Sequence, residues 1–295
     1  MRRGDIADLM LLAALWGASF LFIRVAAPQF GPFSLMGLRT GIGALVLMPF
    51  VARTGGMREL RANAWAIAWV GLLNAALPFV LFGYAMLYLD AGFSSILNAT
   101  VPFWGALVAL AWFGERLGVL RIAGLGVGFA GVLVLVWDRF GSPAGGSGLP
   151  VLAALVATLS YAVAAAATKK RLEGVSALTG AAGSQLFAAL MLAPFAIASW
   201  PAQPADAHGW LSAVLLGVLC TGLAYVLFFR LIARIGSTGA ITVTFLIPVF
   251  GMLWGALFLG ESLTLRMLAG TAAILAGTAL TTGVVSRAWL APRCG

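Results

Sequence analysis

Charged residues are scarce in this chain, and their scarcity excludes a water-soluble fold. Of 295 residues, 9% are charged and 62% are hydrophobic, with a mean hydropathy of +1.04. Soluble domains carry about 25% charged residues. A bilayer accepts such an apolar chain at about 20 residues per crossing, so this length allows about ten crossings. The composition therefore predicts an all-α integral membrane protein with ten transmembrane helices.

Residues that bind metals or form disulfides are almost absent. The chain has one histidine, His208, and two cysteines, Cys220 and Cys294, without the paired spacing of metal sites or disulfide frameworks. Its glycine-rich stretches lie inside apolar runs with no preceding strand, and it has no Gly-x-Ser-x-Gly elbow. The sequence therefore predicts no metal, no cofactor and no enzymatic activity.

Carboxylates are missing from the predicted middle of the membrane. Proton relays and cation-selective pumps usually keep an Asp or Glu there, because such a costly group is retained only for function. All nine acidic residues of this chain instead fall in tails, loops or predicted helix ends: Asp5, Asp8, Glu59, Asp90, Glu115, Asp138, Glu173, Asp206 and Glu261. We therefore expect neither a proton or sodium site of that type nor a strong preference for organic cations.

Apolar runs between charged or Gly/Pro-rich breaks give ten predicted spans. They cover residues 6–26, 34–52, 64–89, 93–113, 119–137, 150–168, 177–199, 210–233, 239–259 and 265–286. With the N-terminus on one side, 14 of the 18 Lys and Arg residues fall on that side and 4 on the other. The positive-inside rule makes that side the cytoplasm, with both termini in it. The net charge of +9 thus reflects topology rather than nucleic-acid binding.

An internal repeat links the two halves of the chain. The segment from Pro102 to Gly114-Glu115 matches the segment from Pro248 to Gly260-Glu261 at an offset of 146, and Trp16 matches Tyr161 at 145. We expect two five-helix repeats, residues 1–141 and 142–295. Because five is odd, the second must be inverted in the membrane, a design that secondary transporters use for alternating access. The alternative is an old duplication kept for packing alone.

Prolines are expected to break three of these spans. A proline inside a helix frees the carbonyl four residues earlier, and such breaks are tolerated in membranes where protein or a water-filled cavity satisfies the freed group. The breaks and freed carbonyls are Pro78 with Asn74, Pro102 with Asn98, and Pro248 with Thr244. The alternative is an ordinary kink capped by a neighbouring helix.

Polar and aromatic residues at similar depth are candidates for binding a substrate. They are Trp16, Ser19, Asn74, Tyr84, Asn98, Trp104, Ser160, Tyr161, Tyr225 and Thr244. Each could instead bridge two helices, as Ser, Thr and Asn often do in membrane bundles. Arg24 and Arg39 could attract a carboxylate or phosphate, but snorkelling to the interface is favoured. Glycines spaced like Gly124 and Gly128 predict that spans 119–137 and 265–286 pack together or form a homodimer surface.

These features together resemble the drug/metabolite transporter superfamily, and its EamA-type exporters in particular. The resemblance rests on Trp16-Gly17-Ala18-Ser19-Phe20 and on the proline-containing spans that end in Gly114-Glu115 and Gly260-Glu261, and it covers about residues 6–286. It implies a ten-helix inverted-repeat fold in the bacterial inner membrane with a substrate cavity between the halves. Small multidrug members carry a glutamate in the first span, where this chain has Leu15-Trp16-Gly17.

The function that the resemblance implies is export of amino acids, because the members most like this chain export aromatic and other neutral ones. Trp16, Tyr84, Trp104, Tyr161 and Tyr225 would suit an aromatic substrate by stacking and burial. The expected partners are a small-molecule substrate and membrane lipid. Two alternatives stay open: a facilitator for another neutral metabolite, and a membrane scaffold or lipid scramblase that transports nothing.

Overall fold

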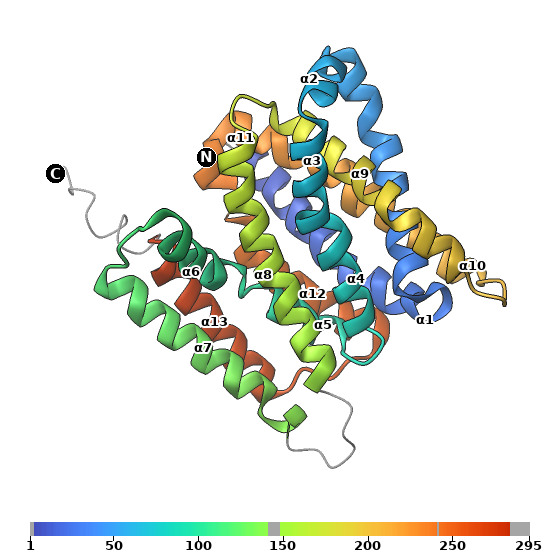
Figure 1. Ribbon diagram of the computed structural model, residues 1–295. Coiled ribbons are helices and arrows are strands. Elements are labelled where there is room, and N and C mark those ends of the chain that lie inside the picture. Colours follow the sequence, from blue (N-terminus) through green and yellow to red (C-terminus); the bar gives the residue numbers. More distant parts are fainter. Residues whose placement is uncertain (1–2, 141–147, 241, 284–295) are drawn as a thin grey trace.

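The computed structural model describes residues 3–140, 148–240 and 242–283, in which every regular element is a helix (Figure 1). The predicted boundary between residues 141 and 142 lies outside these ranges. In chain order the elements are α1 (Arg3–Arg53), α2 (Gly56–Ala62), α3 (Ala64–Gly71), η1 (Leu72–Ala76), α4 (Leu77–Ala85), α5 (Ala91–Asn98), α6 (Val101–Phe113), α7 (Val119–Phe140), α8 (Gly148–Arg171), α9 (Ala177–Ala198), α10 (Ala207–Gly217), η2 (Val218–Leu223), α11 (Ala224–Ala240), α12 (Val243–Leu259) and α13 (Leu265–Thr281).

Most of the described chain lies in helical stretches of membrane-spanning length. Seven continuous helical stretches of the described chain are long and apolar enough to cross a bilayer, and α12 and α13 are shorter apolar helices. The longest helix, α1, is interrupted at Gly31, whose φ of 73° and ψ of 162° are not helical. A glycine adopts this conformation without the steric cost of a side chain. The all-helical membrane architecture predicted from composition is confirmed.

Two π-helical turns interrupt long spans at matching places in the sequence. The first, η1, joins α3 to α4, and the second, η2, joins α10 to α11; they begin at residues 72 and 218, which are 146 positions apart. In η1 the N–H of Leu77 donates to the carbonyl of Leu72, five residues back. Single π turns inside α-helices are frequent at functional sites.

The helix ends after the two proline-containing spans also match. Gly114 ends α6 at φ 65° and ψ 19°, and Gly260 ends α12 at φ 66° and ψ 22°, in the left-handed region that glycine favours. The next N–H bonds back in the same way, from Glu115 to the carbonyl of Ala109 at 3.3 Å and from Glu261 to that of Gly255 at 3.1 Å. The offset of 146 seen in the sequence is therefore also a local structural equivalence.

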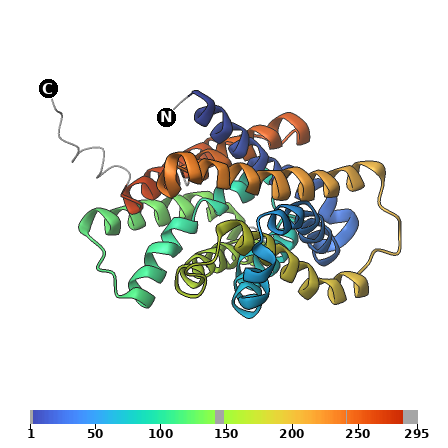
Figure 2. The same cartoon turned by 90° about the horizontal axis from the view of Figure 1, so that it is seen from above.

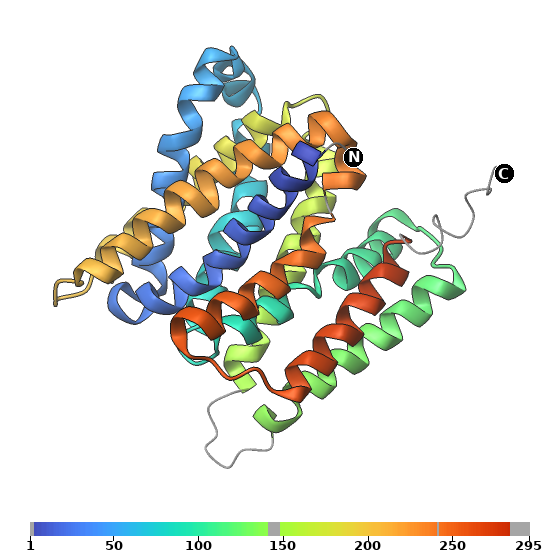
Figure 3. The ribbon, with the colours of Figure 1, turned by 180° about the vertical axis from the view of Figure 1, so that it is seen from behind.

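Helices α7 and α13 pack side by side at the edge of the molecule, as Figures 2 and 3 show. Glycines bring the two backbones together: a methyl group added at Gly277 would lie 2.6 Å from the carbonyl oxygen of Gly124, and one at Gly131 would lie 3.1 Å from that of Gly270. The predicted packing of these two spans is confirmed. Their alternative role as a homodimer surface stays a prediction.

We expect Gly277→Ala to destabilise the α7–α13 pair, because the new methyl group would force two backbones apart. Overpacking of this kind costs about 1–3 kcal/mol. Gly126→Ala, where a methyl group meets no atom within 4 Å, is the matched control on α7. Thermal unfolding of the two purified variants in detergent measures the difference, and equal midpoints would contradict the packing described.

Candidate functional site

Arg39 lies in the interior of the bundle, although a position at the interface was expected. It sits eight residues after the Gly31 kink, about 12 Å along the helix, and is 8% exposed. Its Nε donates to Thr221 Oγ1 at 3.1 Å, and its guanidinium lies 3.8 Å above the ring of Phe79. The prediction that Arg39 snorkels is therefore wrong, because neighbouring helices cover the side chain.

Thr221 is positioned for this contact by the π turn of η2. Its hydroxyl donates to the carbonyl of Leu216, five residues back, at 3.0 Å and accepts from Arg39. A charged arginine at the centre of a membrane costs about 3 kcal/mol on insertion scales. The π turn thus supplies one of the few groups that stabilise the charge.

Two edge-to-face aromatic pairs flank Arg39. Trp16 of α1 contacts Tyr225 of α11 with ring centroids 6.4 Å apart, and Phe79 of α4 contacts Tyr161 of α8 at 6.5 Å. The offsets of 145 and 146 relate Trp16 to Tyr161 and Phe79 to Tyr225, so one pair is the repeat equivalent of the other. Arg39 departs from this symmetry, and it interacts electrostatically with both tyrosines.

Polar side chains complete the cluster. Tyr225 interacts with the side chains of Asn74 and Gln185, and the Cys220 thiol lies beside Ser19. Ser19 and Gln185 are buried, and the Ser19 hydroxyl and both amide atoms of Gln185 have no well-formed hydrogen bond to the described residues. We name Trp16, Arg39, Phe79, Tyr161, Thr221 and Tyr225 the seam cluster, with Ser19, Asn74, Gln185 and Cys220 beside it.

Pro78 breaks its span differently from the sequence-based expectation. In the π pattern of η1, each N–H bonds to the carbonyl five residues earlier, not four. Because proline has no N–H, Pro78 leaves the carbonyl of Leu73 without a backbone partner, and not that of Asn74. Ser160 donates its hydroxyl to this carbonyl at 2.7 Å. Ser160 therefore satisfies the break from a neighbouring helix, and the Asn74 side chain interacts with Tyr225.

The other two prolines lie near breaks at different registers. Pro102 follows the interruption between α5 and α6 and sits in the first turn of α6. Pro248 lies inside α12, which begins at Val243. Counted through the repeat offset of 146, α12 therefore begins about one helical turn earlier than α6, so the two breaks do not lie at equivalent residues.

Several predicted site residues make their contacts away from the seam cluster. Tyr84 pairs with Tyr88 at 5.5 Å, and Trp104 donates its indole N–H to Thr158 at 3.0 Å. Asn98 ends α5 and Thr244 lies in the first turn of α12, both partly buried. Of the ten candidates, the structure brings Trp16, Ser19, Asn74, Tyr161 and Tyr225 together beside Arg39, with Ser160 next to them.

The sequence does not reveal two members of the seam cluster, Phe79 and Thr221, or Gln185 beside it. Phe79 is the repeat equivalent of Tyr225, so the offset alone could have identified it. Thr221 and Gln185 lie in apolar runs without such a signal. Which face of a helix is buried depends on neighbours that the pattern does not specify.

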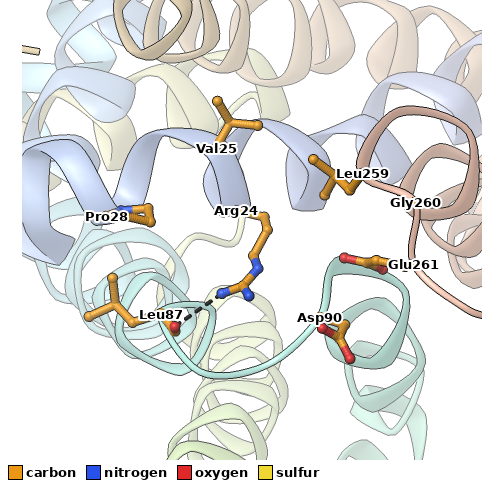
Figure 4. Close-up of a pocket in the computed structure, with 8 residues that line it drawn as sticks. All are labelled: Arg24, Val25, Pro28, Leu87, Asp90, Leu259, Gly260 and Glu261. Carbon is orange, nitrogen blue, oxygen red and sulfur yellow. Dashed lines mark hydrogen bonds between the residues drawn. The ribbon is translucent and has the colours of Figure 1, made fainter. Parts of the chain in front are cut away.

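A second polar region lies where α12 ends, shown in Figure 4. Both oxygens of Glu261 accept backbone N–H groups at the start of α5, from Ala91 at 2.7 Å and from Gly92 at 2.9 Å. A carboxylate at a helix N-terminus forms strong charge-assisted hydrogen bonds. Gly255 makes room, because a methyl group there would overlap the carboxylate. Glu261 thus joins α12 to α5.

A pocket of about 600 Å³ opens beside this junction. Arg24 projects into it and donates to the carbonyls of Met86 and Leu87 at 2.7 and 3.0 Å, so its charge caps the end of α4 (Figure 4). The pocket's lining consists of Arg24, Val25, Pro28, Leu87, Asp90, Leu259, Gly260 and Glu261. None of these residues belongs to the seam cluster.

The equivalent glutamate after α6 is bound differently. Glu115 is 44% exposed and forms long ion pairs with Arg121 at 3.8 Å and with Lys169 at 3.9 Å. Exposed ion pairs of this kind contribute little to the stability of a protein. Ala109 occupies the position equivalent to Gly255, so less room is left for the Glu115 carboxylate. The two ends of the molecule therefore differ in how the repeat-equivalent glutamate is held.

Two further acids accept hydrogen bonds at the start of a helix, Glu59 at α9 and Asp206 at its own helix α10. Glu59 of α2 accepts from the N–H and hydroxyl of Ser176 before α9, at 2.7 and 2.8 Å. Asp206 accepts from Gly209 N–H at 2.7 Å and from Gln29 Nε2 at 3.1 Å. Hydrogen bonds from Thr179 and Ser176 lower the pKa of Glu59, and those from Gly209 and Gln29 lower the pKa of Asp206. Both contacts stay formed at neutral pH.

Comparison with known proteins agrees with these features. The model of the EamA-like transporter family matches residues 6–137 and 148–283. An uncharacterized transporter, YvbV, of Bacillus subtilis is 30% identical over 92% of this chain and 89% of its own. A protein named probable amino-acid metabolite efflux pump of Salmonella typhimurium is 27% identical over 94% of each chain. A solved crystal structure, 21% identical, covers 97% of this chain and 100% of its own with a TM-score of 0.69, so it shares the fold.

We expect Thr221→Val to destabilise the protein, because it removes the oxygen that accepts from the buried Arg39 Nε. Leaving such a donor unsatisfied costs about 1–3 kcal/mol. Thr221→Ser keeps the hydroxyl and is the matched control. Thermal unfolding of both variants measures the effect, and a Thr221→Val variant as stable as Thr221→Ser would contradict the role given to this hydrogen bond.

Proposed function

Because this chain belongs to the EamA-like transporter family, we propose that it is a secondary transporter that exports aromatic and other neutral amino acids by alternating access. Family membership makes it a multi-pass membrane transporter with a small-molecule substrate. Beyond family membership, we propose the substrate class, a location in the bacterial inner membrane, and termini that both lie in the cytoplasm. It rests mainly on one observation: two repeat-equivalent aromatic pairs meet around Arg39 between helices of the two halves.

The length of α1 supports ten spans. Its 51 residues would measure about 75 Å as one helix, whereas the hydrocarbon core is about 30 Å thick. A chain that turns at Gly31 crosses twice instead. The first proposed repeat then has five spans: two in α1, one from α3 to α4, one from α5 to α6, and α7. The second also has five: α8, α9, one from α10 to α11, α12 and α13. The second repeat then enters the membrane from the opposite side.

Alternating access is supported by the unequal ends. The Glu261 junction joins α12 of the second repeat to α5 of the first by two short charge-assisted hydrogen bonds, whereas the ion pairs of Glu115 with described residues are long and exposed. We infer that this conformation is closed at the Glu261 end, which lies outside the cytoplasm in the proposed orientation.

The substrate class is supported by chemistry and by relatives. The aromatic pairs offer edges and faces to an apolar or aromatic side chain. A relative of Streptantibioticus cattleyicolor, 26% identical over 92% of this chain and 91% of its own, is named a probable terminal-alkyne amino-acid exporter. A scaffold or scramblase would have no need for matched aromatic pairs around a buried charge. A facilitator for another neutral metabolite is the alternative that the transport test addresses.

We expect opening at the α5–α12 contact to increase when the Glu261 junction is weakened. Ser95 is fully buried there, against Gly251. In a background without other cysteines, Ser95→Cys should react slowly with a membrane-impermeant thiol reagent. Adding Glu261→Gln or Gly255→Ala should accelerate labelling about tenfold or more. Gly105→Ala, which meets no neighbour, is the control; equal labelling rates in all backgrounds would remove the junction as a gate.

Transport itself is tested with purified full-length protein in proteoliposomes. We expect saturable uptake of labelled L-phenylalanine that unlabelled aromatic and neutral amino acids reduce. Because no carboxylate of the described residues lies in the seam cluster, an imposed pH gradient should change the uptake rate little. Absence of saturable uptake for every amino acid tested would refute the proposed function, and strong acceleration by a pH gradient would refute the ion-coupling inference.

A further inference from the structure

Arg39 carries a charge in the interior that the described residues do not neutralise. Asp5 and Arg39 are the buried charged side chains in the described part of the chain, and Asp5 has an ion pair with Arg234 at 3.7 Å. Arg39 has no ion pair with any described Asp or Glu; its electrostatic neighbours are Tyr161, Cys220 and Tyr225. Buried charges in proteins are ordinarily paired, so Arg39 is an exception that calls for a partner.

The guanidinium is only partly used within the protein. Its Nε donates to Thr221 and its face lies on Phe79, whereas its two terminal nitrogens make no hydrogen bond to a described residue. These nitrogens carry four N–H groups in a planar fork that matches the two oxygens of a carboxylate. The contacts that exist hold the fork in place while leaving its donors available.

Two other side chains support a ligand at this position. Gln185 is fully buried, and a methyl group added at Gly43, one turn after Arg39, would lie 3.9 Å from its Cγ. Ser19 is 5% exposed and lies beside Cys220, the residue before Thr221. The Ser19 hydroxyl and the Gln185 amide lack well-formed hydrogen bonds to the described residues, although Ser19 lies beside the Cys220 thiol and Gln185 beside Tyr225, so their hydrogen-bonding capacity is poorly used for buried groups.

We propose that Arg39 binds the carboxylate of the substrate through its terminal nitrogens, with the Gln185 amide and the Ser19 hydroxyl beside it. This inference rests on the proposed transport function and narrows it to monocarboxylates that carry an apolar or aromatic body, which the Trp16–Tyr225 and Phe79–Tyr161 pairs enclose. One arginine neutralises one negative charge. A phosphate ester, with a charge near −2, would leave an excess charge buried, so a carboxylate is the better match.

The same arrangement selects against close analogues. An amide of the substrate keeps the amine but has no carboxylate, so it offers no negative charge to Arg39. A site built to bind a charged group rejects an analogue without it because its own buried groups are left unpaired. Arg39 is therefore a specificity-determining residue for the acid.

Competition in proteoliposomes tests this assignment. Unlabelled L-phenylalanine and L-phenylalaninamide compete with labelled L-phenylalanine, and we expect the amide to be at least about tenfold weaker with the unaltered protein. Arg39→Gln should raise the half-saturating phenylalanine concentration about ten- to a hundredfold and bring the acid-to-amide ratio near one. Arg39→Lys keeps the charge but loses the fork, so it should keep preferring the acid with weaker binding.

Arg53→Gln, an exposed change at the end of the same helix, is the matched control and should behave like the unaltered protein. Size-exclusion elution and thermal unfolding establish that each variant is folded. If Arg39→Gln does not fold, the acid-to-amide ratios of the unaltered protein and of Arg39→Lys test the inference. An amide that competes as well as the acid, or an unchanged ratio in folded Arg39→Gln, would overturn this inference alone. No saturable uptake by the unaltered protein would instead count against the proposed function.

Discussion

The structure depends on one constraint: inside hydrocarbon, every backbone polar group must find its partner within the protein. Regular helices meet it without help, so each departure from regular helix marks a place where another element must supply a partner. Ser160 supplies it where Pro78 interrupts hydrogen bonding, and Glu261 supplies it where α5 begins. In both cases the partner comes from a distant part of the sequence, so the breaks also join the two halves of the chain.

The same breaks position the chemistry. The π turn of η2 presents Thr221 to Arg39, and η1 places Asn74 beside Tyr225. One extra residue per turn rotates the following helix face, and Phe79 and Tyr225, which follow the two π turns, both interact with the same guanidinium. The repeat thus supplies two equivalent aromatic pairs, and we propose that the unsymmetric charge between them binds the substrate. The proposed substrate site and the proposed gate at Glu261 lie in separate regions of the structure.

Much of this architecture could be predicted from the sequence, because hydrophobic length and repeat offset are properties of the chain alone. The all-helical membrane architecture, the matched glycine ends and the glycine-mediated packing of α7 on α13 followed from such patterns, whereas the count of ten spans stays a prediction. Arg39 did not, because its position near a predicted span end is compatible with both snorkelling and burial. The carbonyl freed by Pro78 was displaced by one residue, since α and π hydrogen bonding cannot be distinguished from residue types. Gln185 and Thr221 gave no signal in their apolar surroundings.

The central claim is that substrate binds at the seam cluster and not in the pocket beside Glu261. A crystal structure of the full chain with 4-bromo-L-phenylalanine, located by the anomalous signal of bromine, tests it most directly. The account predicts bromine density among Trp16, Phe79, Tyr161 and Tyr225, with the carboxylate at Arg39. Density confined to the pocket lined by Arg24, Asp90 and Glu261 would contradict it.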